Sequence, residues 1–210
     1  MARYVGARYP GTVASFLIGA AGDQSPYLQA DRHVTNPDGS VTRVDTHEAG
    51  FLLTDLFGER AGGEVVRVAQ NIHATQTPAI TVWRKTVEVT SQSFAPENAP
   101  RGPVASYSYR SGDKVRVPVV MMRIGDTVLV GLQAELAASV GAQIRASSPF
   151  AHTVVLTMAD GAAKYMPAAD SYDRFTYEAR SSFYARGSAE IVSAGIVDFL
   201  KQMHGGGAQP

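Results

Sequence analysis

The sequence predicts an α+β fold in which a layered, mixed β-sheet is flanked by helices. Two apolar runs, 115–124 and 127–132, are separated only by Gly125-Asp126, which is the pattern of an antiparallel hairpin. Helix and strand patterns alternate in places, but strands also follow one another directly, and the chain has no internal repeat. This order favours a layered α+β arrangement over a doubly wound parallel sheet.

Four patterns describe the first half of the chain. Residues 12–19 are a short apolar run that ends in glycines, which predicts a buried strand entering a tight loop. From 45 to 74 apolar residues recur at spacings of three and four, which predicts one long helix weakened at Gly62-Gly63. Residues 80–89 are rich in β-branched side chains and predict a strand. The stretch 91–113 is rich in proline and glycine and predicts a long connection, either a lid or a binding segment.

The second half continues the mixed pattern after the predicted hairpin. Residues 134–146 predict a helix that ends at Ser147-Ser148-Pro149, and residues 152–158 predict a buried strand. Residues 188–203 predict a final amphipathic helix before a glycine-rich end. We therefore expect a single domain over residues 1–204 and a flexible tail over 205–210.

The composition restricts the classes of partner. The 210 residues include 19 lysines and arginines and 19 acids, so no net charge attracts nucleic acid or an anionic membrane surface. The chain has no cysteine, so a metal would need histidine, carboxylate or phenolate ligands. No segment has the pattern of a signal peptide or of a membrane span, which predicts a soluble, cytoplasmic protein without a transmembrane segment.

Three segments carry a resemblance to a known family. They are "GAAGDQSP" (19–26), "IGDTVLVGLQAEL" (124–136) and "KYMPAADSYDRFTYE" (164–178). In this order they resemble the neutral/alkaline ceramidases, zinc-dependent amidases that cleave the N-acyl bond of ceramide. The resemblance covers nearly all of the chain and corresponds to the second half of the catalytic domain of that family.

The resemblance implies a nucleophile in the first of these segments. The family has a Gly-Asp-x-Ser-Pro segment that supplies a nucleophilic serine, and Gly22-Asp23-Gln24-Ser25-Pro26 matches it, so Ser25 is the counterpart. A serine hydroxyl is a weak nucleophile at neutral pH, and a bound zinc would activate it or a water molecule. The alternative is a turn in which Ser25 bonds only to nearby backbone.

The resemblance also implies two zinc ligands and an oxyanion donor. Glu135, after an apolar strand and at the start of the predicted helix, corresponds to a ligand, and so does Tyr165. Tyr177 corresponds to a tyrosine that hydrogen-bonds to the substrate carbonyl oxygen as negative charge develops. The alternatives are a glutamate favoured by the helix dipole and tyrosines at the rim of the core. The sequence departs from the family in having Ala134, where glycine is usual, before the glutamate.

The zinc ligand set that the resemblance implies is incomplete in this chain. The family takes two histidines from a region upstream of the serine, and none of the five histidines in this sequence forms a His-x-His or His-x-x-x-His pair. Zinc needs three or four protein ligands, so Glu135 and Tyr165 would be half a set. We expect either an amidase completed by another polypeptide or a homologue that serves as a binding or assembly module. In both cases we expect the chain to form a homo-oligomer or to pair with a partner polypeptide. A phosphate-cradling loop at "GAAGDQ" is disfavoured, because it lacks the lysine of a P-loop.

Overall fold

A computed structural model describes residues 1–26, 31–72, 79–93 and 108–206. The chain divides into two compact units. Unit 1 comprises Met1–Leu17 and Ser25–Gln76, and unit 2 comprises Ile18–Gln24 and Thr77–Pro210. The single domain over 1–204 stays a prediction. The last helix extends into the predicted tail, and residues 207–210 of that tail lie outside the described residues.

Unit 1 combines a helical pair with a β-hairpin. Its elements are α1 (Ala2–Arg8), β1 (Asp31–Thr35), β2 (Val41–Asp45), the 3-10 helix η1 (His47–Ala49) and α2 (Gly50–Ala69). The long helix predicted over 45–74 is present as η1 and α2, and residues 73 and 74 lie outside the described residues. α2 is continuous through Gly62-Gly63, and the predicted weakening there stays a prediction. Gly62 allows α1 to approach, since a Cβ at this position would lie 2.7 Å from the Tyr4 ring.

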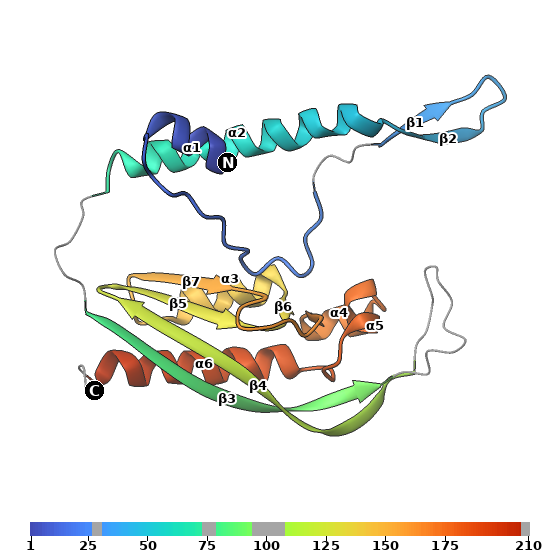
Figure 1. The fold of residues 1–210 in the computed structure, drawn as a ribbon. Coiled ribbons are helices and arrows are strands. Elements are labelled where there is room, and N and C mark those ends of the chain that lie inside the picture. Colours follow the sequence, from blue (N-terminus) through green and yellow to red (C-terminus); the bar gives the residue numbers. More distant parts are fainter. Residues whose placement is uncertain (27–30, 73–78, 94–107, 207–210) are drawn as a thin grey trace. The chain divides into compact units, whose positions relative to one another are not determined.

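Unit 2 is built on a four-stranded mixed sheet. Its strands are β3 (Ile80–Ser93), β4 (Arg110–Ile124), β5 (Thr127–Leu132) and β7 (His152–Leu156), in the order β3-β4-β5-β7 (Figure 1). The hairpin prediction is confirmed, because Ile124 pairs with Thr127 across a two-residue turn in which Gly125 has φ 59°. β3 and β4 extend into the predicted long connection, whose residues 94–107 lie outside the described residues. β5 and β7 are parallel, so the sheet is mixed as predicted.

Short elements and two longer helices complete unit 2. These are β6 (Glu135–Leu136), α3 (Ala138–Ser147), β8 (Tyr165–Met166), α4 (Ala169–Asp173), α5 (Tyr177–Ser181) and α6 (Ser188–Gly205). α6 packs against β3, where Gly195 permits close approach because a Cβ there would lie 2.7 Å from Val87. The core is formed by the inward side chains of the sheet with those of α3 and α6. The fold is therefore α+β with helices flanking a layered sheet, as the sequence predicts.

The second face of this sheet keeps apolar side chains in contact with solvent. Ile80 is 64 % exposed, Val82 49 % and Val154 40 %. On β3 these residues alternate with the side chains that enter the core, as the period of two in a strand requires. The strand predicted over 152–158 is confirmed as β7, but it is covered on one side only.

The strand predicted over residues 12–19 is wrong. Within this run only Gly19 forms a β-bridge, to Leu156, and Phe16 is 71 % exposed. An apolar run becomes a strand only when a neighbour pairs with its backbone. In this run the pairing is confined to its end, where Thr157 N donates to Ile18 O at 3.0 Å.

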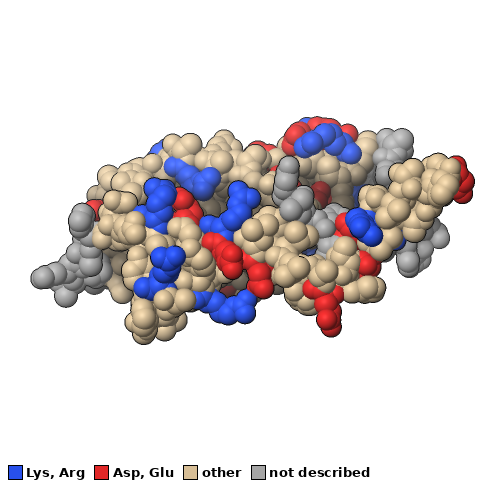
Figure 2. All heavy atoms as spheres, turned by 90° about the horizontal axis from the view of Figure 1, so that it is seen from above, with Lys and Arg blue, Asp and Glu red and all other residues tan. Residues whose placement is uncertain are grey.

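The charges on the face drawn in Figure 2 are mixed in sign. Figure 2 shows lysines and arginines interspersed with aspartates and glutamates on the face drawn. A surface of this kind produces no extended field of one sign. None of the described helices combines the length and the apolar character needed to cross a membrane.

Candidate active site

Glu135 and Tyr165 lie opposite each other in a short parallel pair of strands. β6 pairs with β8 in the register Glu135↔Tyr165 and Leu136↔Met166. Glu135 N donates to Lys164 O at 2.7 Å. Leu136 and Met166 are fully buried, whereas Glu135 and Tyr165 are half-buried. Because side chains alternate along a strand, the two predicted ligands share the face that points away from the core.

The strand pairing also corrects the predicted helix over 134–146. Glu135 lies in β6, and α3 begins only at Ala138. Glu135 N donates to Lys164 O, and Ala137 N donates to Met166 O. These bonds belong to the parallel register in which Glu135 lies opposite Tyr165. Those bonds are incompatible with a helical turn at Glu135, so the alternative of a glutamate stabilised by a helix dipole does not apply.

The Gly22-Asp23 segment is bonded to the same strand. Gly22 is buried, and its N–H donates to Leu136 O at 2.9 Å. A Cβ at Gly22 would lie 2.2 Å from the backbone oxygen of Glu135, so only glycine permits this approach. Asp23 Oδ1 accepts from Ala138 N at 2.8 Å, which satisfies one of the open donors at the start of α3. The Gly-Asp pair of the motif therefore attaches the loop to β6 and α3.

Ser25 follows this attached segment and is the first residue of the second part of unit 1. Three peptide units keep the Cα atom of Ser25 within about 11 Å of that of Gly22. No hydrogen bond of the Ser25 hydroxyl occurs among the described residues, and the side chain is exposed.

Tyr177 is brought next to Tyr165 by α5. Thr176 caps this helix through its Oγ1, which accepts from Ala179 N at 3.3 Å, and Tyr177 is the first helical residue. The ring centroids of Tyr165 and Tyr177 are 5.6 Å apart at an interplanar angle of 70°, an edge-to-face contact. Tyr177 is 60 % exposed, so its hydroxyl is accessible to a ligand.

The electrostatic surroundings of Tyr165 keep its phenol protonated. Desolvation raises the pKa of Tyr165, and the charges of Glu135, Tyr177 and Glu178 raise it further. At neutral pH the phenol is therefore a hydrogen-bond donor, and a phenolate would need an added positive charge nearby.

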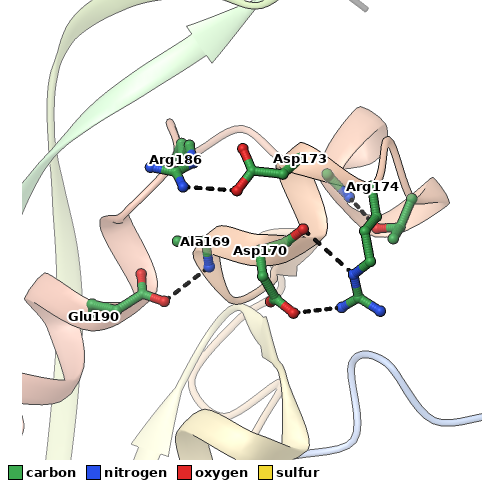
Figure 3. A network of polar contacts seen from close by, with 8 residues as sticks. Ala169, Asp170, Asp173, Arg174, Arg186 and Glu190 are labelled. Carbon is green, nitrogen blue, oxygen red and sulfur yellow. Dashed lines mark hydrogen bonds and ion pairs between the residues drawn. The ribbon is translucent and has the colours of Figure 1, made fainter. Parts of the chain in front are cut away.

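Helix α4 precedes α5 and is fixed by polar contacts (Figure 3). Glu190 Oε1 accepts from Ala169 N at 2.9 Å at the start of α4. Two ion pairs, each 2.8 Å long, also hold this helix: Arg174 with Asp170, and Arg186 with Asp173. All four charged side chains are more than half exposed, and exposed pairs contribute about 0–1 kcal/mol. The partly buried contact of Glu190 therefore holds α4 more firmly than the ion pairs do.

Gln92 anchors α5 from the sheet and was not predicted from the sequence. Its side chain is buried, and its Nε2 donates to Ala179 O at 2.8 Å and to Ser182 O at 3.2 Å. Gln92 follows an irregularity in the pairing of β3 with β4. Gln92 breaks the alternation of buried positions at Val87 and Val89, because the irregularity shifts the register of the strand, so periodicity in the sequence does not identify it.

The described residues of unit 2 do not provide a complete zinc site around Glu135 and Tyr165. His152 pairs with Thr127 at the start of β5, whereas Glu135 follows the end of β5, at the opposite end of the sheet. His204 contacts the Phe150 ring, close to the same end as His152. No group of three or more histidines, aspartates and glutamates placed to hold a metal is found in the described part of the chain.

The other histidines belong to unit 1 or lie outside the described residues. His33 is exposed on β1, and His47 is exposed beside Asp45. His73 falls in the segment that is not described. Two oxygen ligands are fewer than zinc requires, so this chain does not fit a self-contained zinc site within its described residues.

A solved structure has a fold similar to that of this chain. The structure is similar to the crystal structure of neutral ceramidase from Pseudomonas aeruginosa, with a TM-score of 0.65 over 93 % of this chain. The chain has a ceramidase-like fold. The two sequences are 19 % identical, and this chain spans 39 % of the length of that ceramidase. An identity this low shows the fold alone.

A second structural match is weak, and the sequence comparisons found no match. A ceramidase complexed with C2 matches at a TM-score of 0.40 and 25 % identity, covering 43 % of this chain and 15 % of that chain. That score is too low to indicate a shared fold. No family model matches the sequence, and no curated protein matches it either.

Proposed function

We propose that this chain forms part of a ceramidase-like amide hydrolase that cleaves the N-acyl bond of ceramide or of a related N-acyl lipid. The observation that carries the proposal is the grouping of Glu135, Tyr165 and Tyr177 on one face of the β6–β8 pair. The segment that precedes Ser25 is bonded to the same strand. The ceramidase-like fold supports the proposal. The roles of Ser25, Glu135, Tyr165 and Tyr177 come from the sequence resemblance.

In the proposed reaction, Ser25 and Tyr177 act on the amide directly. The Ser25 hydroxyl attacks the carbonyl carbon, and the accessible phenol of Tyr177 donates a hydrogen bond to the carbonyl oxygen as negative charge develops. The C–N bond then breaks, the serine proton ends on the departing amine, and water releases the acyl group. Glu135 and Tyr165 are proposed as half of a zinc ligand set, with the remaining ligands supplied by a second polypeptide or by residues outside the described ones.

Turnover of a fluorescent N-acyl sphingosine, measured on the purified native assembly, tests these roles. We expect Ser25→Ala to remove nearly all activity and to leave stability almost unchanged, because the side chain is exposed and has no hydrogen bond among the described residues. Tyr177→Phe should lower kcat by about 10²-fold to 10³-fold and change KM less. Tyr9→Phe, in unit 1, is the matched control and should be silent. Full activity in both site variants would refute the assignment and favour the turn-forming role of Ser25.

A binding or assembly module is the second candidate function. Two observations favour it: the incomplete ligand set among the described residues, and the apolar sheet face that includes Ile80, Val82 and Val154. Exposed apolar surface of this kind marks an interface in many soluble proteins. We propose a homo-oligomer, in the simplest case a twofold dimer. Light scattering at high protein concentration tests this, and a strictly monomeric species would contradict it.

A further inference from the structure

The loop between β7 and β8 has an unusual backbone. Three of its non-glycine residues have positive φ: Met158 (53°), Asp160 (59°) and Lys164 (47°). Gly161 adds a fourth, at φ 137°. Side chains with a Cβ disfavour this region, so such conformations persist only where the surrounding structure holds them. A loop with this backbone requires a strong local anchor.

Gln133 provides that anchor. Its Nε2 donates to Asp160 O at 2.7 Å, and its backbone oxygen accepts from Ala163 N at 3.1 Å. The loop also lies close against its side chain, since a Cβ at Gly161 would be 2.8 Å from Gln133 Nε2. Gln133 therefore contacts the loop at Asp160, Gly161 and Ala163, and its side chain is half-buried.

The end of the loop determines where Tyr165 lies. Lys164 has the last positive φ, and its carbonyl oxygen accepts from Glu135 N at 2.7 Å. The next residue, Tyr165, then pairs with Glu135 and contacts the ring of Tyr177. Gln133 is two residues before Glu135, so the segment 133–135 binds the loop both in its middle and at its end.

We propose that Gln133 is a positioning residue that holds the loop 158–164 in its left-handed conformation. By doing so it places Tyr165 opposite Glu135 and in ring contact with Tyr177. The catalytic consequence rests on the proposed function, whereas the geometric claim holds whether or not the protein is an amidase. Gln133 itself contacts no reacting atom in this assignment.

Fluorine NMR of the full chain labelled with fluorotyrosine tests the geometry without a substrate. The Tyr165 resonance is assigned by its absence in Tyr165→Phe, and Tyr177→Leu shows where it moves when ring contact is lost. In Gln133→Leu, which removes the side-chain donor at similar size, we expect it to broaden or to move toward the Tyr177→Leu position. The resonance of Tyr172, buried in α4, should stay in place. Gln143→Leu, at an exposed position on α3, is the matched control and should change neither.

A second variant separates positioning from general damage. Adding Asp160→Gly to Gln133→Leu removes the disfavoured Cβ at φ 59°, and should return the Tyr165 resonance part of the way to its original position. A Tyr165 resonance unchanged in Gln133→Leu would overturn the proposal, and so would equal shifts of Tyr165 and Tyr172. If the NMR result holds and the purified native assembly has no amidase activity, the proposed function fails and the positioning role stands.

Discussion

Replacing Gly22 by alanine should damage unit 2 more than its small size suggests. The new Cβ would lie 2.2 Å from the backbone oxygen of Glu135 and 2.7 Å from its carbonyl carbon, and backbone atoms cannot rotate away. Overpacking of this kind costs about 1–3 kcal/mol. Displacing the loop also breaks the bonds from Gly22 N to Leu136 O and from Ala138 N to Asp23, at about 1 kcal/mol each. The free energy of unfolding should therefore fall by roughly 3–5 kcal/mol.

Urea denaturation followed by tryptophan fluorescence measures this loss. The single tryptophan, Trp83, packs against the core of unit 2 and reports on that unit. With a slope of about 2 kcal/mol per molar urea, the midpoint should fall by about 1.5–2.5 M. Gly205→Ala is the control in the same unit, because a Cβ there meets nothing within 4 Å, and it should change stability by less than about 0.5 kcal/mol. A midpoint for Gly22→Ala equal to that of the control would refute the close packing of this loop on β6.

Three further predictions concern other parts of the molecule. Burial raises the pKa of Tyr172 to about 12, so the folded state binds its proton more tightly than the unfolded state. The resulting stabilisation, about 3 kcal/mol, is complete below about pH 10 and lost between about pH 10 and 12. Tyr172→Phe should lessen that alkaline loss in urea titrations. In α2, Gly63→Ala should raise helix stability by about 0.5–1 kcal/mol, whereas Gly62→Ala should lower it through collision with the Tyr4 ring; circular dichroism compares the two. Zinc added to the chain alone should be lost on dialysis, and Glu135→Ala should abolish what binding there is; stoichiometric zinc that survives dialysis by elemental analysis would contradict the half-site.

Local sequence signals were sufficient where an element is stabilised by its own neighbours. The Gly125-Asp126 turn and the strand pair around it were predicted correctly, because the turn and the alternation lie in one short stretch. The final helix was predicted from its apolar spacing. Residues 12–19 failed because an apolar run says nothing about whether a pairing partner is present.

The candidate site was predictable only in part, for a similar reason. The resemblance identified Glu135, Tyr165 and Tyr177, and the structure shows that these three lie together in unit 2. Their roles stay predictions. Periodicity could not show that Glu135 lies in a strand, because its partner is 30 residues away. Nor could it identify Gln133, since a glutamine in a loop contact has no distinctive local pattern.

The backbone bonds that join β6, β8 and the Gly22 loop bear on how such a protein diverges. Glu135 N to Lys164 O, Ala137 N to Met166 O and Gly22 N to Leu136 O are all main-chain bonds, which most side-chain replacements leave intact. Side-chain replacements on these segments therefore leave the framework in place, and with it the spacing of positions 135 and 165. A fold held by main-chain bonds tolerates extensive change of sequence, in agreement with a TM-score of 0.65 to a ceramidase structure at 19 % identity.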